Sequence, residues 1–317
     1  MPSDEFNLIR QYFAGTGSCD FPARLSQGDD AAVIDIPPGF QLLTSVDTLV
    51  EGRHFLAQCD AADLACKALA VNLSDLAAMA SKPAWFLLSL TLPENNASWL
   101  RKFSDELKKI SLRYQVELIG GDTCRGPLSI TIQVMGLAET NRYVSRSGAK
   151  TGDKIVVSGE LGTAAIGLAG LQGKIELNDA EQIAGSLALN RPIPRLDLID
   201  LLQSCASSAI DLSDGLVGDL RHLIEASGKG ARLVRNDIPV SSFIKSNKLY
   251  DYALTGGDDY ELCFTVPDSG IAIINQWNTD NPQKPLLVIG EIIEEGYYLE
   301  TDSESLDLSD LHGFQHF

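Results

Sequence analysis

Several aspartates of this 317-residue chain lie where apolar runs of strand length stop. Each cluster lies beside glycine, serine or threonine, residues that let a chain leave a strand and turn. The pattern predicts apolar strands that end in acidic loops, and we expect these loops to converge on one site. Five such clusters occur, at Gly28–Asp30, Thr44–Asp47, Gly120–Thr123, Asp211–Gly215 and Gly256–Asp259.

Gathered carboxylates need a compensating charge. A carboxylate at the edge of a core is costly alone, and neighbouring carboxylates raise one another's pKa unless a cation intervenes. Mg²⁺ takes carboxylate ligands, keeps several waters and shares its shell with substrate phosphates. Asn72 and Asp75 join the clusters from an expected helix, where i,i+3 spacing makes them neighbours. A single Asp-Gly pair is more often a turn or a cap, but five clusters together predict a multi-magnesium phosphate site.

The composition excludes several partner classes. The chain has 43 acidic and 25 basic side chains and a net charge of -18, which argues against nucleic acid and anionic membranes as partners. No segment reaches the roughly 20 apolar residues that span a bilayer, and the N-terminus lacks a secretory pattern. Six cysteines without a CxxC pair and four histidines without zinc spacing favour a reducing, cytoplasmic setting.

Hydrophobic periodicity predicts two α/β domains. The N-terminal domain, 1–137, is expected to contain helices at 61–80 and 97–114 and strands at 31–36, 41–46, 85–92, 116–119 and 128–136. A polar linker at 138–152 opens the C-terminal domain, 138–317. Its expected helices are at 161–171, 179–188, 195–204 and 215–227. Its expected strands are at 154–158, 208–211, 231–235, 261–266, 286–291 and 297–300.

Several familiar nucleotide chemistries have no counterpart in the sequence. There is no GxxxxGKS/T phosphate loop, no HRD and DFG pair, and no GxSxG elbow. Gly15 and Gly17 lack the third glycine and the preceding strand of a dinucleotide-binding turn.

The acidic clusters lie in longer motifs that resemble those of the thiamine-monophosphate kinase family, in order and over nearly the whole chain. The wider relatives of that family are aminoimidazole ribonucleotide synthetases, selenophosphate synthetases and a hydrogenase-maturation protein. The motifs are GDDAAVI at 28–34, SVDTLVEGRHF at 45–55, KALAVNLSDLAAMA at 67–80, LIGGDTCRGPLSITI at 118–132, SRSGAKTGD at 145–153, SAIDLSDGL at 208–216 and GGDDYELCFTV at 256–266.

The resemblance implies a two-domain aminoimidazole ribonucleotide synthetase-like fold whose N-terminal sheets pair into a dimeric β-barrel. The N-terminal domain would carry the metal and ATP site and the dimer interface, and the C-terminal domain would complete the ATP and substrate site. The implied activity is ATP-dependent, Mg²⁺-assisted in-line phosphorylation of thiamine monophosphate to thiamine diphosphate by a cytoplasmic homodimer.

The resemblance also implies residue roles. The magnesium ligands would be Asp30, Ser45, Val46, Asp47, Asp75, Asp122, Asp211 and Asp214, of which Asp30, Asp75, Asp122 and Asp211 form the expected catalytic set. The residues that contact ATP would be Gly121, Asp122, Arg146 and Ser213. Those that contact the thiamine part would be His54, Asp258 and Phe314.

Three positions depart from the family pattern. Asp258 stands where the family more often has glutamate, so its reach is one methylene shorter at the same charge. Phe314 stands where relatives carry tyrosine or tryptophan, which keeps stacking and loses a polar group. Val46 replaces a hydroxyl residue and has only its backbone carbonyl to offer a metal.

Two alternative functions remain open at this point. The first is another ATP-dependent member of the superfamily, such as an aminoimidazole ribonucleotide synthetase. The motif around His54 together with GGDDYEL at 256–262 favours the kinase. The second is a non-catalytic nucleotide- or Mg²⁺-binding protein, against which the intact metal positions argue.

Overall fold

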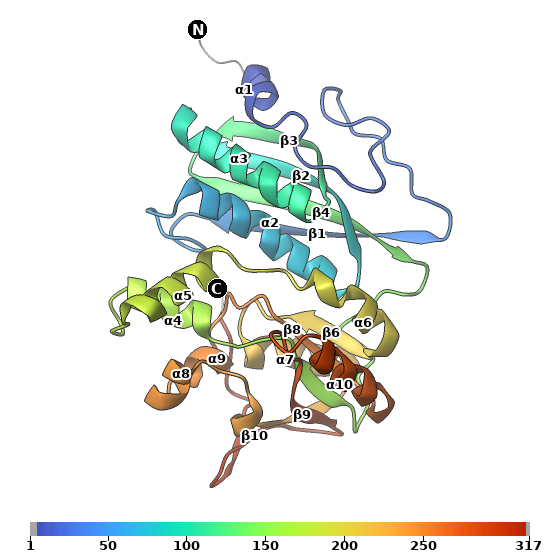
Figure 1. Cartoon of the computed structure of the whole chain (residues 1–317), viewed down its shortest axis with the longest axis vertical. Helices are drawn as coiled ribbons and strands as arrows, with labels where there is room; N and C mark the ends of the chain where they lie inside the picture. Colours follow the sequence, from blue (N-terminus) through green and yellow to red (C-terminus); the bar gives the residue numbers. More distant parts are fainter. Residues whose placement is uncertain (1–4, 315–317) are drawn as a thin grey trace. The chain divides into compact units, whose positions relative to one another are not determined.

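The computed structural model describes residues 5–314, which form two compact units of mixed helix and strand (Figure 1). The first unit consists of the chain up to Leu76 together with Ser81–Arg142. The second consists of Ala77–Ala80 and the chain from Tyr143 onward. Between the last strand of the first unit and the first strand of the second, residues 140–153 form neither helix nor strand, as the polar composition predicts.

The first unit is built on a four-stranded sheet of order β1-β4-β2-β3. The strands are β1 (Phe40–Val50), β2 (Lys82–Leu92), β3 (Glu117–Arg125) and β4 (Ser129–Glu139). Strands β1 and β2 each run antiparallel to β4, while β2 and β3 are parallel. β1 is therefore an edge strand, with β4 as its partner within the unit.

Two long helices lie along one face of this sheet (Figure 1), and a short one, α1 (Glu5–Tyr12), precedes them. α3 (Ala97–Arg113) begins where Asn96 accepts hydrogen bonds from the amides of Ser98 and Trp99, an N-cap that satisfies free amides. Leu100, Phe103, Leu107 and Ile110 lie on its buried face, at the three- and four-residue spacing of an amphipathic helix. α2 (Ala61–Ala78) is buried along most of its length, in keeping with its apolar composition.

One predicted strand of the first unit is wrong. Residues 31–36 form no strand, and their pairing is limited to one bridge in which Val33 and Leu25 exchange two backbone hydrogen bonds. Val33 remains 42% exposed. The segment has strand-like composition, but strand propensity depends on a neighbouring edge with which to pair.

The second unit contains a seven-stranded sheet of order β11-β10-β7-β9-β5-β8-β6. β7 and β10 are parallel, and the other neighbouring pairs are antiparallel. The strands are β5 (Lys154–Val157), β6 (Ser208–Asp211), β7 (Gly230–Val234), β8 (Leu262–Val266), β9 (Leu287–Ile293), β10 (Tyr297–Glu300) and β11 (Ser305–Asp307).

The second sheet is covered on both faces because its buried strands alternate between two cores. In β5, Ile155 and Val157 pack with the residues of α7 (Leu216–Ser227), whereas Val156 packs with those of α6 (Ile199–Cys205) and α10 (Ile271–Asp280). This follows from the two-residue period of a strand. The double burial fixes β6 firmly, and β6 ends at Asp211.

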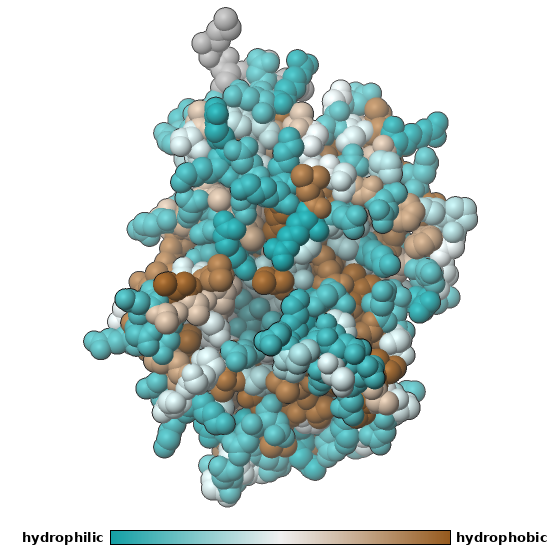
Figure 2. All heavy atoms as spheres, viewed as in Figure 1, coloured by the Kyte–Doolittle hydropathy of each residue, from teal (hydrophilic) through white to brown (hydrophobic). Residues whose placement is uncertain are grey.

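The remaining helices of this unit are α4 (Thr163–Leu171), α5 (Asp179–Asn190), α8 (Ser242–Asn247) and α9 (Asp251–Leu254). Hydrophobic side chains gather at the surface over α4 and α5 (Figure 2), where Ile183 and Leu187 are exposed. The sequence patterns missed α1, α8, α9, α10 and β11, which are short or weakly periodic.

The α/β class and the two-unit organisation are confirmed. Within residues 5–314, neither sheet closes into a barrel. Among the helices described, none combines the length and the apolar character needed to cross a membrane.

Candidate active site

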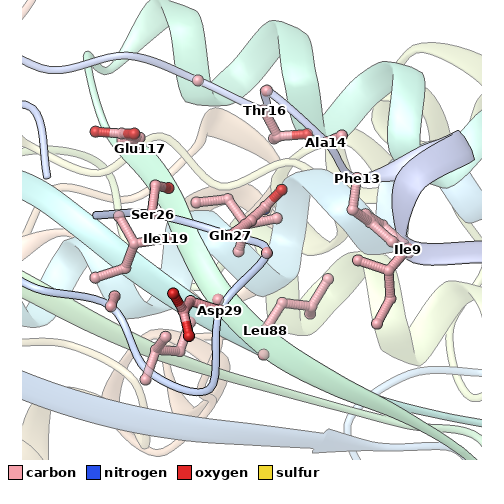
Figure 3. A pocket seen from close by; sticks show the side chains of 18 of the residues that line it. Ile9, Phe13, Ala14, Thr16, Ser26, Gln27, Asp29, Leu88, Glu117 and Ile119 are labelled. Carbon is pink, nitrogen blue, oxygen red and sulfur yellow. The ribbon is translucent and has the colours of Figure 1, made fainter. Parts of the chain in front are cut away.

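In the first unit a cavity of about 1280 Å³ lies between the N-terminal segment and the start of β3 (Figure 3). Its lining includes Asp29 and Asp30 from one acidic cluster and Gly121 and Asp122 from another. Figure 3 shows Ile9 and Phe13 at one end of the cavity and Glu117 and Ile119 at the other. Two clusters that are about 90 positions apart in the sequence thus share one cavity.

The paired glycines that precede Asp122 have a packing reason. At Gly121 the backbone φ is +152°, and a Cβ atom there would lie 1.8 Å from the carbonyl oxygen of Leu88 on β2. Such a contact requires the backbone to shift. At Gly120 the nearest atom is the side-chain Cδ2 of Leu87, at 3.2 Å. Gly121 therefore lets β3 approach β2 closely, with Asp122 opposite Ser89 in the strand register.

A second group of predicted ligands meets where β1 faces α2. Ser45 donates a hydrogen bond from Oγ to Asp75 Oδ2 at 2.6 Å, and the amide of Asp47 donates to Asn72 Oδ1 at 3.0 Å. Asn72 is oriented by its Nδ2, which donates to the carbonyl of Ala68. The alternation of β1 places Ser45 and Asp47 towards α2.

Val46 lies between them on the opposite, exposed face of β1, with 57% of its surface accessible. Because its side chain faces away from Asp75, a role for Val46 at the metal would have to use its backbone.

His54 lies in the turn that follows β1. The amide of Val50 donates to His54 Nδ1 at 3.0 Å, and the ammonium of the buried Lys67 donates to the His54 carbonyl at 3.3 Å. A ring nitrogen that accepts a hydrogen bond carries no proton, so the neutral ring is protonated at Nε2. The turn thereby holds both the position and the tautomer of His54.

In the second unit, the loop Ser213–Gly215 between β6 and α7 connects the predicted site residues. Asp211, at the end of β6, is 5% exposed. The Asp258 amide donates to the Ser213 carbonyl at 2.8 Å, and the Phe314 amide donates to the Asp214 carbonyl at 2.9 Å. Within this unit, the structure thus brings Ser213, Asp214, Asp258 and Phe314 together.

Sequence reasoning missed Asp219, the residue that holds this loop. Its Oδ2 accepts hydrogen bonds from the amides of Asp214 at 2.9 Å and Gly215 at 3.1 Å, and the residue is 3% exposed. Burial raises the pKa of Asp219 to about 7, and the nearby Asp214 charge adds to the rise. An acid in the first turn of a predicted helix was the available signal, because carboxylates there accept from free amides.

Arg146 lies elsewhere in the second unit. Ser227 Oγ, on the last residue of α7, donates to the Arg146 carbonyl at 3.3 Å, whereas Ser213 precedes the first turn of α7. A helix of 12 residues is about 18 Å long at the usual rise. The backbones of these two predicted ATP contacts therefore lie near opposite ends of α7.

The donors fit magnesium better than a structural zinc site. In the described part of the chain, no three His, Cys, Asp or Glu side chains form a preassembled metal cluster. The polar contacts at the predicted ligands join oxygen-bearing side chains, as in Ser45–Asp75. Zinc sites are closed by nitrogen and sulfur, whereas Mg²⁺ is held by one or two carboxylates and completed by water and phosphate.

Comparisons with known proteins assign both halves of the chain to one class. The family model for the AIR synthase related protein, N-terminal domain, matches residues 28–138, and that for the AIR synthase related protein, C-terminal domain, matches residues 150–301. The hydrogenase maturation protein HypE from E. coli shares the fold, with a TM-score of 0.77 at 19% identity over 98% of this chain and 97% of that one. The fold and these matches define an AIR synthase related protein.

Relatives with higher sequence identity show which family within this class the chain belongs to. The thiamine-monophosphate kinase of Escherichia coli (strain K12) is 44% identical over 328 residues, which covers 100% of this chain and 99% of the relative. The crystal structure of thiamine-monophosphate kinase from Stenotrophomonas maltophilia K279a has a TM-score of 0.83 at 37% identity, and the match covers 90% of this chain and 93% of that one. AaThiL complexed with AMPPCP and TMP has a TM-score of 0.78 at 32% identity, covering 89% of each chain. The chain belongs to the thiamine-monophosphate kinase family.

Proposed function

We propose that this protein transfers the γ-phosphoryl group of ATP to the phosphate of thiamine monophosphate, giving thiamine diphosphate and ADP. The observation that carries the proposal is the full-length match, at 44% identity, to a thiamine-monophosphate kinase. The AaThiL structure with AMPPCP and TMP supports the same pair of substrates. In this chain, the expected catalytic positions 30, 75, 122 and 211 are all aspartates.

The reaction needs positioning and charge compensation more than a base. A phosphate monoester has its second pKa near 6, so the attacking oxygen is already largely anionic at neutral pH. When bound, Mg²⁺ would neutralise and orient the two polyanions. In the first unit it would be held by Asp30, Ser45, Asp47, Asp75 and Asp122, with Val46 through its carbonyl, and in the second by Asp211 and Asp214.

The chain's own residues would divide the two substrates between them. Gly121 and Asp122, beside the cavity of the first unit, and Ser213, on the loop of the second, would contact ATP. Arg146 would add a permanently charged, directional donor for phosphate, reaching from its position beside the end of α7.

The thiamine side of the site would be formed by His54, Asp258 and Phe314. The carboxylate of Asp258 suits the cationic ring system of thiamine, and Phe314 offers a stacking surface that is 43% exposed. Residues 1–137 would then provide the metal and ATP site, and residues 138–317 would complete it. The cytoplasmic location expected from the sequence stays a prediction.

A coupled assay tests the activity directly. The chain is incubated with ATP, Mg²⁺ and thiamine monophosphate, and thiamine diphosphate and ADP are quantified. We expect the two products in equal amounts, and no ADP above background when thiamine monophosphate is left out. Thermal stabilisation by ATP and Mg²⁺ without transfer to thiamine monophosphate would instead support a non-catalytic nucleotide-binding protein.

We further propose that two copies pair through β1 and together form a β-barrel. β1 is an edge strand of the described sheet, with β4 as its strand partner, and such an edge can pair with a strand of another chain. Its face away from α2 exposes Leu42, Val46 and Val50, of which Val46 is the most accessible at 57%. An open edge bordered by apolar side chains is the kind of surface that a second copy would cover.

Replacing Leu42 by lysine is expected to weaken this dimer. A charge on the apolar face of β1 would be desolvated in the interface. Light scattering coupled to gel filtration should give about twice the chain mass of 34.2 kDa for the wild type and a mass falling towards the monomer for Leu42→Lys on dilution. Leu112→Lys, at a 54% exposed position on α3, is the matched control. An equal, undiminished dimer mass for both variants would contradict pairing through β1.

A further inference from the structure

The segment that carries Asp258 has an unusual backbone. Asp258 and Tyr260 both adopt positive φ angles, +69° and +50°. Residues other than glycine rarely take this left-handed conformation, and it persists only where the surroundings fix it. Asp259 lies between them and contacts a different part of the fold.

Asp259 connects this segment to the start of α4. Both of its carboxylate oxygens lie 2.9 Å from the amide nitrogen of Gly162. Gly162 is the N-cap residue of α4 and has no side chain with which to cap the helix itself. The first amides of a helix need an acceptor, and a carboxylate there also matches the helix dipole. Asp259, 97 positions away in the sequence, acts as the cap of α4.

Backbone hydrogen bonds fix the segment on its other side. The Asp258 amide donates to the Ser213 carbonyl, and the Tyr260 amide donates to the Leu212 carbonyl, each at 2.8 Å. Asp258 is therefore held between two anchors. One is the backbone of the β6–α7 loop, and the other is the pair of hydrogen bonds between Asp259 and the Gly162 amide at the start of α4.

The backbone around these anchors is closely packed and has little room to move. A Cβ atom on Gly162 would lie 2.8 Å from the amide nitrogen of Ala253, and one on Gly256 would lie 2.4 Å from the Cβ of Ala165 on α4. α4 thus contacts both α9 and the residues just before Asp258. With α4 fixed in this way, releasing Asp259 frees the left-handed segment rather than the helix.

We propose that Asp259 is a positioning residue. Its hydrogen bonds to the N-terminus of α4 fix the position of the Asp258 carboxylate, and thereby the affinity for the thiamine part of the substrate. The inference rests on the proposed function, in which Asp258 contacts that part. Asp259 itself would not touch the substrate. Burial raises the pKa of Asp259 well above its usual value.

Steady-state kinetics of two substitutions test the inference. Asp259→Ala removes both acceptors and should raise the KM for thiamine monophosphate at least tenfold, while the KM for ATP stays within twofold. Asp259→Asn keeps one carbonyl oxygen near the Gly162 amide and should recover most of the loss. Asp268→Ala, at an exposed aspartate of the same unit, is the control and should match the wild type.

A double-substitution cycle separates positioning from general damage. If Asp259 acts through Asp258, Asp258→Ala and Asp258→Ala/Asp259→Ala should share one raised KM for thiamine monophosphate. The inference would be overturned if the double variant showed the product of the two single-variant rises in KM, or if the KM for ATP rose as much as that for thiamine monophosphate. A wild-type KM for thiamine monophosphate in Asp258→Ala would also overturn it. Wild-type turnover of thiamine monophosphate tests the proposed function separately, because the inference is read from differences among active variants.

Discussion

Replacing Asp75 by asparagine is expected to lower kcat for thiamine diphosphate formation by about 10³-fold and to leave the midpoint of thermal unfolding within ~2 °C of the wild type. Asp75 accepts the Ser45 hydroxyl at 2.6 Å, a contact that the asparagine carbonyl can keep, so the local fold is retained. The lost charge is the one proposed to hold Mg²⁺ between two phosphates. Asp30→Asn should behave alike, because Asp30 lines the same cavity as Asp122.

The control for this prediction is Asp105→Asn on α3, an exposed aspartate of the same unit, which should keep full activity. Activity should be measured across a magnesium titration, because a weakened site can be refilled at high metal concentration. Near-normal turnover of both Asp30→Asn and Asp75→Asn at low magnesium would remove these residues from the proposed metal site.

Replacing Glu261 by alanine is expected to lower the free energy of unfolding by about 3 kcal/mol, because it removes one ion-pair partner of the buried Arg195 guanidinium. Glu261 Oε2 accepts from Ser158 Oγ at 2.5 Å and from Arg195 Nη1 at 2.9 Å. Only 5% of the Arg195 side chain is exposed, and without Glu261 its ion pairs among the described residues reduce to that with Asp197, at 3.0 Å. Glu261→Gln, which keeps an acceptor oxygen, should lose less.

Hydrogen exchange at the β8 amides is the suitable measurement, since it reports on the second unit alone. The control is Glu294→Ala, which removes the partner of Lys229 at a site where the glutamate is 71% exposed. Exposed ion pairs contribute little to stability, so Glu294→Ala should have the same hydrogen-exchange protection as the wild type. If both variants lost the same stability, burial would not be the reason that the Glu261 pair matters.

Local patterns anticipated much of the fold. The helix predicted at 97–114 is observed as α3, and the strand predicted at 208–211 ends at Asp211 as observed. These features depend on nearby residues alone. The strand predicted at 31–36 is not observed. Forming it would have required a pairing partner distant in the sequence, and hydrophobic periodicity does not show whether one is present.

The candidate site was anticipated unevenly for the same reason. The acidic clusters were expected where strands end, which holds for Asp211–Gly215 after β6. It is wrong for Thr44–Asp47, which lies within β1, and for Gly120–Thr123, which lies within β3. Asp219 was missed, and Asp259 was counted only as a member of an acidic cluster. The role of each lies in the backbone amides from which it accepts hydrogen bonds, at Asp214 and Gly215 for Asp219 and at Gly162 for Asp259. Nor could a motif show that Arg146 lies beside the far end of α7 from Ser213.

The alternation of β1 has an evolutionary consequence. One side of this strand presents Ser45 and Asp47 to α2, and the other exposes Leu42 and Val46. Inserting or deleting a single residue in the middle of β1 would exchange the two sides beyond that point. Apolar side chains would then face α2 and acidic ones would face outward, so the proposed metal site and the proposed dimer interface would be disrupted together. Change in this strand is therefore confined to substitutions, whereas length variation must be accommodated in the turns on either side.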